Sequence, residues 1–156
     1  MLAVGAPAPE LDRPIVTIDG EETTLAQLAG GKALLLILLK TSCKSCKVGL
    51  PFASTLAKKL DDAPLSIVAV SQDSPNVSRS FRRRYEVDLP FVVDNADFPL
   101  SNAYGIEATP TWFLIGADGI IKNTGFGVFH QPLNSLLDTI ADEIPGAPRL
   151  TFSDID

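Results

Sequence analysis

A continuous apolar run at residues 33–39 leads within a few residues into the only two cysteines of the chain, in Cys43-Lys44-Ser45-Cys46. Such a run predicts a strand that is buried on both faces of a sheet. The CxxC then predicts a helix start, where unpaired backbone N–H groups and the positive end of the helix dipole favour a thiolate. We therefore expect Cys43 at a helix N-terminus and Cys46 one turn further along.

The CxxC could instead be half of a zinc site or a static disulfide. Zinc needs about four ligands, and the chain offers no third cysteine and a single histidine, His130, far away in sequence. A disulfide that closes so short a loop restrains little of the unfolded chain. Redox chemistry is therefore favoured, with no metal and no cofactor beyond the redox-active Cys43–Cys46 disulfide.

Composition narrows the classes of protein that remain. The chain has 156 residues, 46% of them hydrophobic and 21% charged, which fits one globular domain with a sizeable core. A net charge of −6 argues against nucleic acid as a partner. No stretch reaches the roughly 18 apolar residues of a membrane span, and the N-terminus lacks a signal-peptide pattern. As the sequence stands we expect a cytoplasmic location, or a periplasmic or other extracytoplasmic one if an export segment was removed.

Strand and helix signals alternate along the chain. Asp19-Gly20 and Asp118-Gly119 predict two hairpins, and Pro51 lies inside the helix that begins at the CxxC. Further elements are expected at residues 25–29, 65–70, 75–85, 91–93, 99–104, 111–115, 120–123 and 132–144. This order predicts an α/β fold with a mixed sheet at residues 1–144, followed by a loosely held C-terminal tail at residues 145–156.

Three separated motifs resemble those of one protein family. They are the CxxC after a buried strand, Pro51 five residues beyond Cys46, and Ala108-Thr109-Pro110-Thr111-Trp112-Phe113-Leu114 followed by Asp118-Gly119. With Gly5-Ala6-Pro7-Ala8-Pro9 and Gly31-Lys32, they resemble the thioredoxin superfamily, and within it the TlpA/ResA-like thiol-disulfide oxidoreductases related to the AhpC/TSA redoxins. The resemblance implies a thioredoxin-like fold. This is a central mixed β-sheet flanked by helices, with an N-terminal β-hairpin extension and an inserted helix–strand segment.

The resemblance also implies an enzyme, a protein disulfide reductase that exchanges disulfides through its CxxC dithiol. Cys43 would attack the substrate disulfide, and Cys46 would resolve the mixed disulfide. Thr109–Pro110 would be a cis peptide bond that faces the cysteines and binds an extended substrate segment. The implied partners are protein disulfides or dithiols and a thiol reductant, and we expect a monomer.

Three positions near the cysteines depart from the family pattern. Ser42 stands where a Trp is usual, Ile37 where thioredoxins carry a buried Asp, and Gly49 where ResA-like proteins carry a Glu. Those carboxylates are thought to manage the proton of the resolving cysteine, so the proton relay is expected to differ here. Lys40 and Lys44 add positive charge near the thiols and are candidates for tuning their pKa, although both also fit solvated surface lysines.

Three other functions stay open at this point. A thiol-dependent peroxidase of the AhpC/TSA type usually has Thr or Ser three residues before its cysteine and an Arg much later. In this chain the residue three positions before Cys43 is Lys40, and the residue three positions before Cys46 is Cys43. No arginine lies between Arg84 and Arg149. A metallochaperone of the copper-delivering Sco type has a CxxxC motif and a histidine near the position of Thr109. This chain has CxxC, and its single histidine is His130. A non-enzymatic interaction domain on this fold would have little need for an intact CxxC.

Overall fold

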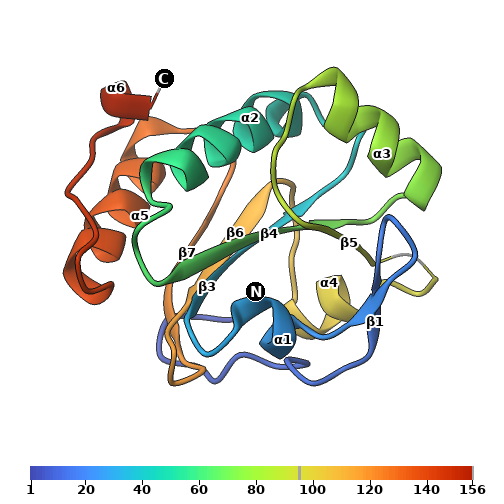
Figure 1. Ribbon diagram of the computed structural model, residues 1–156, viewed down its shortest axis with the longest axis horizontal. Helices are drawn as coiled ribbons and strands as arrows, with labels where there is room; N and C mark the ends of the chain where they lie inside the picture. The colour runs from blue at the N-terminus through green and yellow to red at the C-terminus, as the bar shows by residue number, and fades with distance from the viewer. Residues whose placement is uncertain (95, 156) are drawn as a thin grey trace.

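The computed structural model describes residues 1–94 and 96–155. One seven-stranded mixed sheet, in the order β2-β1-β5-β4-β3-β6-β7, runs through the molecule with helices on both faces (Figure 1). The elements along the chain are β1 (Ile15–Thr17), β2 (Glu22–Thr23), α1 (Leu25–Ala29), β3 (Ala33–Leu39), α2 (Lys44–Lys59), β4 (Leu65–Ser71), α3 (Pro75–Arg84), β5 (Phe91–Val93), α4 (Pro99–Tyr104), β6 (Thr111–Ile115), β7 (Ile121–Phe126), α5 (His130–Glu143) and α6 (Phe152–Ile155). This arrangement confirms the predicted α/β fold with a mixed sheet. Within the described ranges, every helix is too short or too polar to cross a membrane.

Strand β3 is buried along its whole length, as its apolar sequence predicts. It pairs in parallel with β4 and antiparallel with β6. Successive side chains of a strand point to opposite faces, so β3 contributes to two cores. Leu35 and Leu39 join the core beneath α2, α3 and α5, whereas Leu34 and Leu38 join the core formed with α1 and α4.

The C-terminal end of β3 is the edge of the sheet at which the cysteines lie. Leu38 pairs with Thr111, the first residue of β6, which brings the loop after β3 beside the segment that precedes β6. Leu39 pairs with Ser71, the last residue of β4, so the loop after β4 reaches the same edge. Three loops that are distant in sequence therefore meet where α2 begins.

Two boundaries differ from the sequence prediction by two residues or more. Helix α5 begins at His130 and not at Pro132, because the first N–H groups of a helix have no intrahelical partner and a proline is tolerated there. Strand β7 runs from Ile121 to Phe126 and so continues through Gly125. A Cβ at Gly125 would overlap the ring of Trp112, so the glycine allows this buried side chain to lie flat against the strand.

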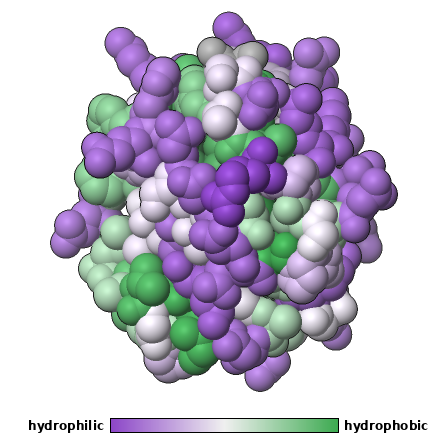
Figure 2. Space-filling model, turned by 90° about the vertical axis from the view of Figure 1, so that its left-hand side faces the viewer, coloured by the Kyte–Doolittle hydropathy of each residue, from purple (hydrophilic) through white to green (hydrophobic). Residues whose placement is uncertain are grey.

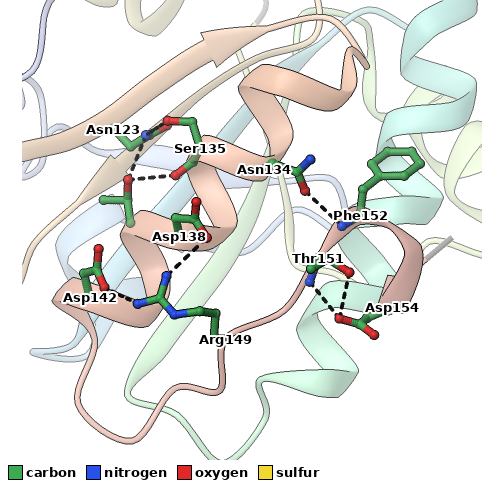
Figure 3. A network of polar contacts seen from close by, with 10 residues as sticks. Asn123, Asn134, Ser135, Asp138, Asp142, Arg149, Thr151, Phe152 and Asp154 are labelled. Atoms are coloured by element: carbon green, nitrogen blue, oxygen red, sulfur yellow. Dashed lines mark hydrogen bonds and ion pairs between the residues drawn. The ribbon is translucent and has the colours of Figure 1, made fainter.

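The expectation of a loosely held tail was wrong for the described part of residues 145–155. Phe152 stacks on Phe52 of α2 with ring centroids 5.4 Å apart, and Ile155 of α6 is only 7% exposed. The polar contacts of the tail with α5 are Arg149 with Asp138 and Asp142, and the Phe152 N–H with Asn134 Oδ1 (Figure 3). On the side of the molecule that carries α5 and α6, hydrophobic areas are broken up by hydrophilic residues (Figure 2).

Candidate active site

The two cysteines sit at the start of α2 in unequal surroundings. Cys43 is the N-cap residue of the helix, and its Sγ accepts a hydrogen bond from the Cys46 N–H at 3.1 Å. Both residues are free thiols in this structure. The Cys43 side chain is half-buried, whereas Cys46 is 0% exposed. The Cys43 sulfur is therefore accessible to a partner molecule, whereas the Cys46 sulfur is buried behind it.

The pKa of the Cys43 thiol is lowered below its ordinary value. Burial by itself raises this pKa, but the hydrogen bonds around the sulfur outweigh it. They involve Cys46, Thr109 and the backbone N–H groups of Cys46 and Ser45. Hydrogen bonds donated to a thiolate stabilise the charged form, as expected at a helix N-terminus. Cys43 is therefore the more acidic thiol and the better nucleophile at neutral pH.

The pKa of the Cys46 thiol moves in the opposite direction, to about 12. Burial is the largest cause, because a thiolate in apolar surroundings loses its hydration. The hydrogen bond with Cys43 and the proximity of that thiol's charge raise the pKa further. Cys46 thus keeps its proton at neutral pH in the dithiol form.

The Thr109–Pro110 peptide bond is cis and faces Cys43, which confirms the sequence prediction. The Cys43 thiol donates to the Thr109 carbonyl oxygen at 3.3 Å. Pro110 is buried, and its carbonyl oxygen accepts from the Gly127 N–H at 2.8 Å. A Cβ at Gly49 would lie 3.3 Å from the Pro110 side chain, so the glycine permits α2 to approach this turn closely.

An apolar cavity of about 30 Å³ lies between α2 and the sheet. Its lining includes Ile37, Gly49, Pro110 and Trp112. Ile37 and Gly49 are the two positions where the family pattern has carboxylates. Here the same space is lined by hydrocarbon, so neither position supplies a base to Cys46.

The two lysines proposed to tune the thiols have exposed side chains. Lys40 contributes its backbone carbonyl, which accepts from the Cys43 N–H at 3.2 Å. Lys44 is the first residue of α2. Neither ammonium group is among the causes of the Cys43 pKa shift, so tuning by Lys40 or Lys44 stays a prediction.

A carboxylate near the site was missed by the sequence analysis. Asp73 lies just after β4, and its Oδ2 accepts hydrogen bonds from both the N–H and the hydroxyl of Thr41. A polar residue at the end of a buried strand was the available signal. It becomes informative once β4 is placed parallel to β3, because parallel strands end at the same edge of a sheet.

The family model for the AhpC/TSA family matches residues 4–124 of the chain. The chain belongs to the AhpC/TSA family. Its relatives by sequence include the following two proteins. The thiol-disulfide oxidoreductase ResA of Geobacillus thermodenitrificans (strain NG80-2) is 33% identical over 122 residues, which cover 78% of this chain and 68% of that protein. The thioredoxin-like protein YneN of Bacillus subtilis (strain 168) is 31% identical over 135 residues, covering 81% and 74%.

Solved structures of redox proteins share the fold of this AhpC/TSA family member. The thioredoxin domain of thiol-disulfide oxidoreductase BVU-2223 from Bacteroides vulgatus superposes with a TM-score of 0.77 at 19% identity, covering 90% of this chain and 99% of that chain. Peroxidoxin BcpB from Mycobacterium tuberculosis gives a TM-score of 0.78 at 17% identity, covering 91% and 98%. The predicted thioredoxin-like fold is thereby confirmed.

Proposed function

We propose that this protein is a thiol-disulfide oxidoreductase that reduces protein disulfides with the Cys43–Cys46 dithiol. The observation that carries the proposal is the inequality of the two thiols. Cys43 is accessible and has a lowered pKa, whereas Cys46 is buried and has a raised one. A nucleophile in front of a protonated resolving thiol is the arrangement that thiol–disulfide exchange needs. The relatives named as thiol-disulfide oxidoreductases support the same chemistry.

The reaction takes place in two exchanges. The Cys43 thiolate attacks one sulfur of the substrate disulfide, that bond breaks, and the departing substrate thiolate takes up a proton. Cys46 then gives up its proton and attacks the Cys43 sulfur. The Cys43–Cys46 disulfide forms, and the second substrate sulfur leaves as a thiol. The substrate has gained two electrons and two protons, which a thiol reductant later returns to the enzyme.

Thr109 is proposed to hold the substrate while these exchanges occur. Its carbonyl oxygen lies 3.3 Å from the Cys43 sulfur, beside the point of attack. An extended substrate segment could pair with this backbone as an added strand does. Because Cys43, Cys46 and Thr109 all come from one chain, we propose that the protein works as a monomer on protein disulfides or dithiols.

The proposal is tested by the reduction of insulin disulfides with dithiothreitol as reductant. The protein should accelerate the reaction, and Cys43→Ser should abolish the acceleration. Ser42→Ala is the matched control, since it changes an exposed neighbour of the nucleophile and should keep turnover close to that of the unchanged protein. Full activity of Cys43→Ser would overturn the proposal.

Thiol-dependent peroxide reduction is the second candidate, and membership of the AhpC/TSA family favours it. The surroundings of Cys43 favour it less, because Lys40 stands three residues before the cysteine and the chain lacks an arginine between Arg84 and Arg149. Peroxide consumption in the presence of dithiothreitol separates the two candidates. A rate above that of dithiothreitol alone, in a protein that leaves insulin intact, would establish the peroxidase.

A further inference from the structure

The loop that carries Cys43 is tied to a neighbouring loop by one carboxylate. Oδ2 of Asp73 lies 2.7 Å from the Thr41 backbone N and 2.9 Å from the Thr41 hydroxyl oxygen. Thr41 stands two residues before Cys43, in the short connection between β3 and α2. Hydrogen bonds to an ionised acceptor are stronger than neutral ones, and two of them to one residue fix its orientation.

Asp73 is itself held by buried groups. Its N–H donates to the Ser71 hydroxyl at 3.2 Å, and its carbonyl accepts from the Ser78 hydroxyl at 3.4 Å. Ser71 and Ser78 are both 0% exposed, and their hydroxyl oxygens are 2.7 Å apart. The neighbouring Gln72 N–H donates to the carbonyl of Leu39, the last residue of β3. The residue that anchors the loop is therefore itself tied to the buried ends of β3 and β4 and to α3.

The contacts of the Cys43 sulfur depend on where this loop stands. Sγ must remain close to the Cys46 N–H and the Thr109 carbonyl, at 3.1 Å and 3.3 Å. We propose that Asp73 is a positioning residue for the nucleophile, which acts through Thr41 to hold Cys43 against these two groups. The inference deepens the proposed function, on which its catalytic meaning rests.

Positioning and charge predict opposite results when Asp73 is neutralised. A carboxylate near a thiol opposes formation of the thiolate, so removing its charge alone would lower the Cys43 pKa and speed alkylation. Loss of positioning weakens the hydrogen bond that the Cys46 N–H donates to the Cys43 sulfur, which favours the thiolate, so it raises the Cys43 pKa and slows alkylation. The sign of the change in Asp73→Asn therefore distinguishes the two effects.

The test is the rate of iodoacetamide alkylation of Cys43 against pH in the full reduced chain. We expect Asp73→Asn to slow the reaction at pH 7 by about three- to tenfold, which corresponds to about half to one pKa unit, with rates that converge above pH 9. Thr41→Val removes only the hydroxyl bond and should show a smaller shift in the same direction. Thr41→Ser keeps both hydrogen bonds, so its alkylation profile should match that of the unchanged protein.

Two results would overturn the inference. One is alkylation of Asp73→Asn at pH 7 that is as fast as in the unchanged protein, or faster. The other is slowing by the same factor at every pH, which would show altered access to the sulfur. If Asp73→Asn does not fold, the comparison of the Cys43 alkylation profiles of Thr41→Val and Thr41→Ser takes its place. Insulin reduction is measured in parallel, so an inactive unchanged protein with the expected alkylation profiles would refute the proposed function and leave the positioning of Cys43 intact.

Discussion

The burial of Cys46 makes a quantitative prediction about its reactivity. Its pKa rises from 9.0 to about 12, first because of burial and then because of the hydrogen bond with Cys43. A raised pKa means that the thiol keeps its proton, and three pKa units correspond to about a thousandfold less thiolate, or about 4 kcal/mol. Cys43 shifts in the other direction and carries more thiolate than an ordinary thiol at neutral pH.

The assay compares alkylation in the folded and the unfolded protein. Cys43→Ala leaves only Cys46, and Cys46→Ala leaves only Cys43, so each thiol can be followed alone with iodoacetamide at pH 7. Folding should slow alkylation of Cys46 by about a hundredfold or more, because burial both keeps the thiol protonated and blocks access, although the part of the pKa shift that comes from Cys43 is absent in this variant. Folding should speed alkylation of Cys43 in the Cys46→Ala variant, or leave it unchanged if the lost thiol–thiol hydrogen bond offsets the helix N-terminus.

The pH dependence gives an independent check on the same reasoning. The Cys43 rate should level off at a lower pH than that of an ordinary thiol, because its pKa is lowered. The Cys46 rate should keep rising about tenfold per pH unit up to pH 10 and beyond, since its thiolate fraction is still small. A Cys46 rate in the folded protein within tenfold of the unfolded rate would refute the argument from burial.

Three further predictions concern stability. The reduced protein should lose stability as pH rises from 9 towards 12, because the Cys46 contribution is fully present below the ordinary pKa of 9.0 and is lost as the folded pKa of about 12 is approached. Urea unfolding of Cys46→Ala should lack this loss, and equal slopes would contradict it. Asn123→Ala should cost about 1–3 kcal/mol in the same assay, because the buried Trp112 Nε1–H loses its acceptor; a cost below about 0.5 kcal/mol would argue against that role. Phe152→Ala should cost about 1–3 kcal/mol, because the ring packs between α2 and α5. An unchanged unfolding midpoint for this variant would mean that the tail contributes nothing to the fold.

The parts of the fold that the sequence predicts well depend on local signals. The seven apolar residues of β3 need no knowledge of their neighbours to be assigned to a buried strand. Asp118-Gly119 sets the turn between β6 and β7, as its sequence predicts. In each case the residues that determine the structure lie within a few positions of one another.

The parts that were missed depend on tertiary packing. Ser153 and Asp154 make the C-terminal segment look like a polar tail, and Phe152 is partly buried only because α2 and α5 offer a surface for it. The contact between Thr41 and Asp73 joins residues 32 positions apart. It follows from the sequence only if the parallel pairing of β3 and β4 is already known. Short local patterns carry no information about either of these tertiary contacts.

The most direct test of the central claim is to trap the mixed disulfide. Cys46→Ser removes the resolving thiol, so attack by Cys43 on a substrate disulfide should stop at the covalent adduct. Mass spectrometry of the non-reduced digest after mixing with insulin should then find a substrate cysteine joined to Cys43. The matched Cys43→Ser variant should give no adduct, because Cys46 is buried and protonated. An adduct that forms through Cys46 while Cys43 stays free would contradict the roles assigned to the two cysteines.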